Sequence, residues 1–127
     1  MAQSDIVLGQ SPGQGRGVFA ARRFSKGELI ELCPVIVLSE SDAEKLNDTH
    51  LYNYYFGWGD QGKAAAIAGG FGCFYNHSNT PNAFCQKILA DDAIRFVAAV
   101  SIEPGEEIRF EYSFGYAAGG KPWFEVL

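Results

Sequence analysis

The chain has 127 residues, with 15 Asp and Glu against 10 Lys and Arg, so its formal net charge is -5 at pH 7. This length fits one domain, and a hydrophobic content of 47% with 20% charged residues excludes an intrinsically disordered chain. The acidic balance argues against a dedicated nucleic-acid binder, which usually carries a basic face, and suits a cationic partner.

Turn residues separate many short apolar segments, and helix signals are scarce. We expect a loop over residues 11–17, a short helix that starts at 39–44 and frays near Asn47, and an aromatic block over 51–58. Pro34 cannot donate to a ladder, so its strand is expected to be kinked or at an edge. The predicted strands are, in chain order, 6–8, 18–23, 28–38, 83–89, 93–100 and 107–112, of which 83–100 form a hairpin. These elements predict a mainly β domain with little helix.

The cysteines and the N-terminal sequence indicate an intracellular protein. Three cysteines cannot all pair, no apolar segment of a signal peptide follows Met1, and no apolar run approaches the ~20 residues that cross a bilayer. We therefore expect reduced thiols and no membrane contact. Cys73, His77 and Cys85 could be drawn together as a zinc site, but their spacing matches no paired C-x-x-C arrangement, so no metal is expected.

Three segments stand out for their polar or glycine-rich pattern. Residues 13–17 carry Gly-x-Gly-x-Gly, which lacks the G-x-G-x-x-G spacing of a dinucleotide loop and is read as a turn or as backbone that approaches a polar ligand closely. Residues 71–75 are mostly apolar and run into the polar cluster 76–82, which is either a capped turn or an amide and imidazole presented to a ligand. Taken alone, residues 106–112 indicate an amphipathic strand whose aromatic side chains face the core.

Together these segments resemble the motifs of a known enzyme family. Gly15-Arg16-Gly17-Val18-Phe19-Ala20, Asn76-His77-Ser78-x-x-Pro81-Asn82 and Gly105-Glu106-Glu107-Ile108-x-Phe110-x-Tyr112 occur in the order found in SET domain protein-lysine methyltransferases, which use S-adenosylmethionine. The resemblance covers about residues 6–116 and is strongest to the minimal single-domain SET proteins of bacteria and large DNA viruses. It implies a mainly β fold of the SET or β-clip type, with small curved sheets, short helices and a knot-like C-terminal crossing. Residues 1–127 would form one domain.

The resemblance also assigns roles to individual residues. It implies that Tyr112 is the catalytic tyrosine. The side chains and backbone implied to hold the cofactor are Gly15, Arg16, Gly17, Asn76, His77 and, if the tail 117–127 closes over the site, Trp123. The implied lysine channel contains Tyr54, Phe110 and Tyr116, and a Phe at position 110 favours higher methylation states in the family.

Methyl transfer to lysine gives these residue types a chemical reason. A free lysine has a pKa of ~10.4 and is unreactive when protonated, and an aromatic channel beside a sulfonium cation lowers that pKa by desolvation and repulsion. The expected substrate is a lysine in a basic or histone-like protein tail, which the acidic surface would attract. The expected location is the cytoplasm for a bacterial protein and the nucleus or host chromatin for a viral, eukaryotic or effector protein.

Alternatives remain open at this stage. A non-catalytic β-clip module could bind a ligand or peptide without turnover, and an inactive SET scaffold could keep the fold without binding cofactor. The sequence also leaves open a homodimer that completes the substrate groove.

Overall fold

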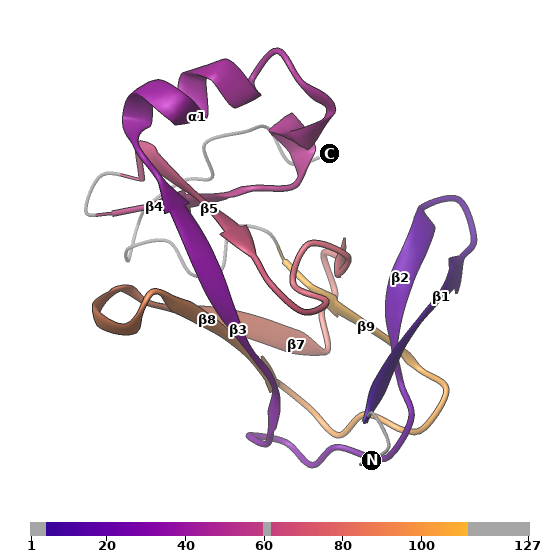
Figure 1. The fold of residues 1–127 in the computed structure, drawn as a ribbon. Coiled ribbons are helices and arrows are strands. Elements are labelled where there is room, and N and C mark those ends of the chain that lie inside the picture. The colour runs from indigo at the N-terminus through magenta and orange to yellow at the C-terminus, as the bar shows by residue number, and fades with distance from the viewer. Residues whose placement is uncertain (1–4, 60–61, 112–127) are drawn as a thin grey trace.

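The computed structural model describes residues 5–59 and 62–111, and these residues are mostly β. The strands are β1 (Ile6–Ser11), β2 (Gly15–Ala20), β3 (Leu29–Leu38), β4 (Phe56–Trp58), β5 (Ala64–Ala68), β6 (Asn76–His77), β7 (Ala83–Ile88), β8 (Ala93–Ala98) and β9 (Glu107–Phe110). They hydrogen-bond in the order β1-β2-β9-β7-β8-β3-β5-β4, and β6 also pairs with β9 (Figure 1). The predicted mainly β fold is confirmed.

The second strand of the N-terminal hairpin begins at Gly15, three residues earlier than the sequence predicted. β1 and β2 are antiparallel, with Ile6 opposite Ala20 and Ser11 opposite Gly15, so the predicted loop 11–17 contains the first half of β2. The turn is closed by the amide of Gln14, which donates to the carbonyl of Ser11 at 3.0 Å. Gly13 and Gly15 flank this turn at φ values of +77° and +76°, which glycine adopts without steric cost.

Pro34 marks the point where β3 changes partner. Residues Leu29 to Pro34 pair with β8, and Val35 to Leu38 pair with β5. Proline has no amide hydrogen to donate, so it fits the junction between the two pairings better than the middle of either. One long strand therefore joins two ribbons, β7–β8 and β4–β5, and changes partner at the proline where a kink or a sheet edge was expected.

Two short helices accompany the β4–β5 ribbon. Helix α1 (Glu40–Leu46) packs against β5, and Ser39 caps it by accepting the amide of Asp42 at 3.1 Å. It ends at Leu46 with Asn47 as its C-cap, close to the position where the sequence predicted that it would fray. The aromatic block begins as a 3-10 helix (His50–Asn53) before β4, so it is divided between two elements.

The core contains side chains from the β1–β2 hairpin, from β3, β4 and β5, and from β7, β8 and β9. Its largest fully buried side chains are Val18, Phe24, Cys33, Ile94, Phe96, Ile102 and Ile108. They come from six different segments, so this core depends on pairings between distant parts of the chain. The predicted hairpin over residues 83–100 is confirmed as β7 and β8, joined through the turn at Leu89–Asp91.

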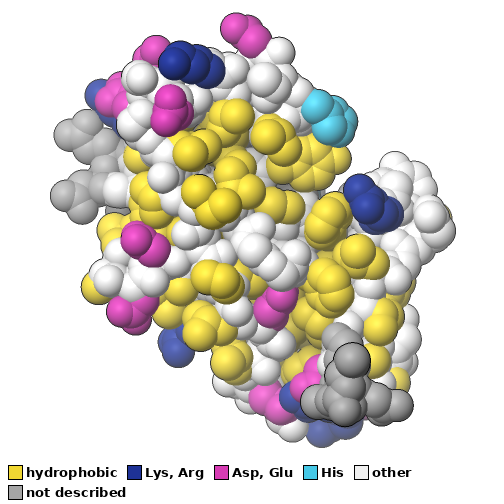
Figure 2. All heavy atoms as spheres, in the orientation of Figure 1, with side chains coloured by type: hydrophobic (Ala, Val, Ile, Leu, Met, Phe, Trp, Pro, Cys, Tyr) yellow, Lys and Arg dark blue, Asp and Glu magenta, His cyan; other side chains and the backbone are white. Residues whose placement is uncertain are grey.

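One face of β3 is apolar and open to solvent. Leu32 is 55% exposed and Ile36 67%, and Figure 2 shows hydrophobic side chains gathered over the region where β3 lies. Within the described residues, no helix is long and apolar enough to span a bilayer.

Candidate active site

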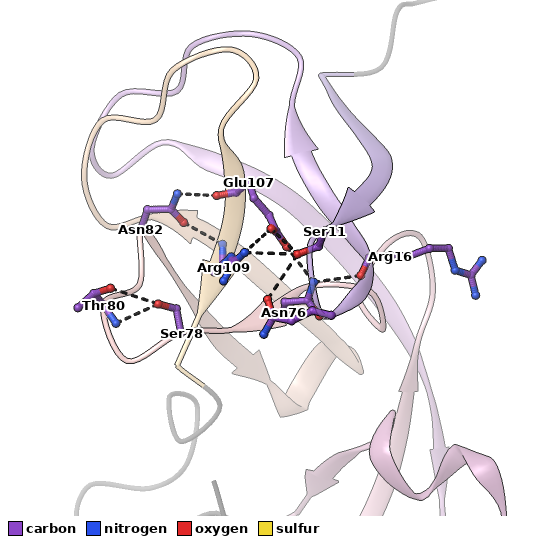
Figure 3. A network of polar contacts seen from close by, with 9 residues as sticks. Ser11, Arg16, Asn76, Ser78, Thr80, Asn82, Glu107 and Arg109 are labelled. Atoms are coloured by element: carbon purple, nitrogen blue, oxygen red, sulfur yellow. Dashed lines mark hydrogen bonds and ion pairs between the residues drawn. The ribbon is translucent and has the colours of Figure 1, made fainter. Parts of the chain in front are cut away.

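The carboxylate of Glu107, at the start of β9, joins three segments that are far apart in sequence (Figure 3). Its Oε1 accepts the hydroxyl of Ser11 at 2.7 Å and Nη2 of Arg109 at 2.6 Å. Its Oε2 accepts Nδ2 of Asn76 at 2.8 Å. One side chain therefore ties the end of β1, the Asn-His segment and β9 together.

Hydrogen bonding keeps this carboxyl ionised although it is nearly enclosed. The Glu107 side chain is 9% exposed, and burial acts to raise its pKa. The hydrogen bonds from Asn76 and Ser11, and the hydrogen bond and charge of Arg109, outweigh burial, so the pKa of Glu107 lies below its usual value. A charged carboxylate accepts hydrogen bonds on all sides and donates none.

Asn76 is held at two points. Besides Glu107, its Nδ2 donates to the carbonyl of Arg16 at 3.0 Å. Gly17 makes this approach feasible, because a Cβ there would collide with the Glu107 carboxylate and lie 2.9 Å from Nδ2 of Asn76. Gly17, the last glycine of the Gly-x-Gly-x-Gly segment, therefore leaves space for Asn76 and Glu107, which come from the other two motifs, to contact each other.

Asn82 closes the polar segment against β9. Its Nδ2 donates to the carbonyl of Glu107 at 2.9 Å, and its Oδ1 accepts the amide of Arg109 at 2.9 Å. The parallel pairing of β6 with β9 sets Asn76 opposite Arg109 and His77 opposite Phe110. The amide of Ser78 continues this contact with a 3.1 Å bond to the carbonyl of Phe110.

Arg16 and His77 lie at the open side of this network. The Arg16 guanidinium carbon is 4.6 Å from the ring centroid of Phe74, and the side chain is exposed. The ring Nε2 of His77 lies 2.9 Å from Oδ1 of Asn79. An exposed cation and a partly exposed imidazole therefore flank Asn76.

Phe110 ends β9 inside a cluster of four aromatic rings, three from strands β4, β8 and β9 and one from Tyr75, just before β6. It is 3% exposed, and its ring centroid lies 6.3 Å from that of Phe56 and 5.3 Å from that of Phe96. Tyr75 stacks on Phe96 at 4.1 Å and meets Phe110 edge-on at 6.3 Å. The His77–Phe110 register therefore places this apolar cluster next to the polar network.

The remaining predicted site residues make other contacts or fall outside the described residues. The ring of Tyr54 is 5.2 Å from that of His50, and it is partly exposed. Tyr52 and Tyr55, from the same aromatic block, line a separate hollow of about 350 Å³ beside α1. Tyr112, Tyr116 and Trp123 fall outside the described residues, as does the crossing that would follow Glu111.

Sequence reasoning missed several residues that build the site. Glu107 and Asn82 belong to the motifs named above, and a carboxylate and an amide within such motifs could have been identified as hydrogen-bonding residues. Ser11, Arg109 and Tyr75 gave no such signal, because each of them has a hydrogen-bond partner that lies between 44 and 98 residues away in the sequence. Among the described residues, no three His, Cys, Asp or Glu side chains gather as metal ligands, and Cys33, Cys73 and Cys85 form no disulfide. Independence from metal stays a prediction.

The sequence pattern of the SET domain family matches residues 15–113, well over half of the chain. The chain therefore belongs to the SET domain family of protein-lysine methyltransferases that use S-adenosylmethionine. A Schizosaccharomyces pombe relative, a histone-lysine N-methyltransferase specific for H3 lysine-37, is 27% identical over 124 residues, which cover 97% of this chain and 79% of that protein. The Drosophila melanogaster histone-lysine N-methyltransferase trr is 28% identical over 119 residues, but these are 5% of its length.

Solved structures agree with this assignment. A Plasmodium falciparum protein described as a histone methyltransferase has a TM-score of 0.73 and 26% identity, covering 98% of this chain and all of that one. The Chaetomium thermophilum Polycomb Repressive Complex 2 bound to S-adenosylmethionine has a TM-score of 0.72 at 22% identity and shows the shared fold. The aligned region covers 87% of this chain and 15% of the larger chain.

Proposed function

We propose that this SET protein transfers a methyl group from S-adenosylmethionine to a lysine amine in a histone or another basic protein tail. The fission yeast relative acts on histone H3, which supports this substrate class and action at chromatin. The formal charge of -5 favours encounter with a basic tail. We further propose that residues 1–127 act as one domain, and a homodimer stays a prediction.

The chemistry of the donor set fits the amino-acid end of this cofactor. Oδ1 of Asn76 has no hydrogen-bond partner among the described residues, so it is an acceptor for the α-ammonium. The exposed guanidinium of Arg16 suits the α-carboxylate. Nothing lies within 4 Å of the position where a Cβ of Gly15 would be, which leaves room for a ligand along β2. We assign Gly15, Gly17 and His77 to the same site, and Trp123 to its closure by the tail.

The aromatic cluster around Phe110 suits the binding of the lysine substrate. The bound cofactor supplies an electrophilic methyl group on a sulfonium. We propose that Phe110, with Tyr54 and Tyr116, lines the channel that admits the lysine. Such a channel favours the neutral amine by excluding water, and alignment of the amine with the methyl group is worth up to roughly 7–11 kcal/mol in ideal cases. We assign Tyr112 to orient the amine through its hydroxyl.

The observation that carries this proposal is the His77–Phe110 register, which holds the proposed cofactor residues beside the aromatic cluster. Incubation with labelled S-adenosylmethionine and histones should label lysine side chains. Tyr112→Phe should remove most transfer while S-adenosylhomocysteine binding, measured by calorimetry, stays near normal. Binding without transfer to histones or other basic proteins would instead favour a non-catalytic module, and absence of binding would favour an inactive scaffold.

A further inference from the structure

We propose that Glu107 is a positioning residue for the methyl donor: its carboxylate fixes the side-chain amide of Asn76 so that Oδ1 faces the α-ammonium of the cofactor. The inference rests on the proposed function, and it adds a residue that makes no contact with substrate.

The two acceptors around Nδ2 define which way the Asn76 amide points. Oε2 of Glu107 lies 2.8 Å from Nδ2 and the carbonyl of Arg16 lies 3.0 Å from it. Rotation of the amide by 180° would replace both hydrogen bonds by contacts between oxygen atoms. Among the described residues Oδ1 has no partner, so the same constraint that fixes Nδ2 presents Oδ1 as an acceptor.

Both carboxylate oxygens of Glu107 must accept hydrogen bonds, because donors face each of them. Oε1 of Glu107 receives donors from Ser11 at 2.7 Å and Arg109 at 2.6 Å, while Oε2 receives Asn76. A glutamine has one oxygen and one NH₂ group in the same space. Arg109 can only donate and makes the stronger, charge-assisted hydrogen bond, so the glutamine oxygen should turn toward Arg109 and Ser11. Its NH₂ group then faces Nδ2 of Asn76, and the hydrogen bond to Asn76 is lost.

Arg109 already neutralises the charge of Glu107, so Glu107 acts on the cofactor by fixing the orientation of Asn76 rather than through its charge. Nη2 of Arg109 forms the ion pair with Oε1, and the Arg109 side chain is 33% exposed. The carboxylate is thus held from one side by a cation and reaches Asn76 with the other oxygen. Gly17 permits this approach, because a Cβ there would occupy the space of the carboxylate.

A double-mutant cycle tests whether Glu107 acts through Asn76. S-adenosylhomocysteine affinity is measured by calorimetry for the full chain, for Glu107→Gln, for Asn76→Ala and for the double variant. We expect Glu107→Gln to weaken binding about tenfold in the native background and less than about twofold when position 76 is Ala. Equal weakening in both backgrounds, or unchanged affinity of Glu107→Gln, overturns the proposal.

A spectroscopic measurement reads the orientation without the cofactor. The side-chain NH₂ resonances of Asn76 in the free protein should show slow hydrogen exchange, and Glu107→Gln should remove that protection. Glu103→Gln is the matched control, because Glu103 is 56% exposed and pairs with Arg23; it should leave the affinity and the Asn76 resonances unchanged. Rapid exchange of the Asn76 NH₂ protons in the native protein would also contradict the inference.

Ser11→Ala provides a milder variant if Glu107→Gln fails to fold. It removes one donor from Oε1 and leaves the Glu107–Asn76 bond in place, so we expect weakening of about two- to threefold in the native background and none when position 76 is Ala. Equal weakening in both backgrounds would overturn the proposal here too. If the native chain itself binds no S-adenosylhomocysteine, the proposed function fails; if it binds and the cycle is additive, only the role of Glu107 fails.

Discussion

The hydroxyl of Tyr75 donates a 2.8 Å hydrogen bond to Oε1 of Glu31, a residue 44 positions earlier in the chain. Oε2 of the same carboxylate accepts the amide of Phe71 at 2.9 Å. Tyr75 is 2% exposed, and burial, followed by the nearby charge of Glu31, raises its pKa well above the usual range. The pair connects β3 to the aromatic cluster around Phe110, so it fixes one wall of the proposed lysine channel.

Removing this hydroxyl should destabilise the fold without changing cofactor affinity. Tyr75→Phe keeps the stacked ring but leaves Glu31 with one donor fewer, and we expect a loss of about 1–2 kcal/mol in the free energy of unfolding. Urea unfolding measures it. Tyr55→Phe is the matched control, since its hydroxyl bonds to Asn47 at 2.8 Å near the surface; it should cost less than about 0.5 kcal/mol. Equal costs for the two variants would contradict the assigned importance of the buried pair.

Gly17→Ala should be more harmful than a glycine substitution in the adjacent turn. Its Cβ would collide with Glu107 and crowd Asn76, so we expect a loss of about 1–3 kcal/mol in stability together with weaker S-adenosylhomocysteine binding. Gly13→Ala meets no atom within 4 Å and should show only the cost of a positive φ, about 1 kcal/mol, with binding retained. Thermal unfolding and calorimetry distinguish the two. Retained binding by Gly17→Ala would show that the close approach is dispensable.

The stabilising effect of Glu107 should depend on pH in a defined direction. Its pKa is lower in the folded than in the unfolded chain, so its contribution is present above the unfolded value and is lost as pH falls through the folded one. With a reference pKa of ~4.3, the stability difference between the native chain and Glu107→Gln should be largest near neutral pH and shrink below about pH 4. Urea unfolding across this range measures the difference. A difference that grows on acidification would contradict the sign.

Phe110→Tyr should lower the number of methyl groups added per lysine. The added hydroxyl would enter a cluster where Phe110 is 3% exposed, and it would need a hydrogen-bond partner such as the amine or a water molecule. Either partner restricts the space for a methylated amine. Mass spectrometry of a lysine peptide after long incubation should show fewer di- and trimethyl products. An unchanged product distribution would remove Phe110 from the proposed channel.

Local sequence patterns predicted most elements but not their partners. The β7–β8 hairpin and the helix capped by Ser39 were readable because turn and cap residues lie next to the segments that they control. The start of β2 at Gly15 was missed, because glycines favour turns and only the pairing with β1 makes this segment a strand. The role of Pro34 as a junction depends on β5 and β8, which follow it by dozens of residues.

The candidate site shows the same division. The three motifs were visible in sequence order, and the family pattern covers them. That they meet at the carboxylate of Glu107 was not predictable, because Ser11 and Glu107 are 96 residues apart and no local periodicity encodes their contact. The roles of Tyr112, Tyr116 and Trp123 stay predictions.

The bonds of Glu107 also have a consequence for how the chain folds. They join residues near both ends of the described chain, and contacts of such sequence separation require closure of a long loop, which slows folding. During synthesis the network cannot close until β9 has left the ribosome, so every shorter nascent chain lacks it. Fragments that end before residue 107 should therefore keep at most the local hairpins, and the site should appear in a single late step.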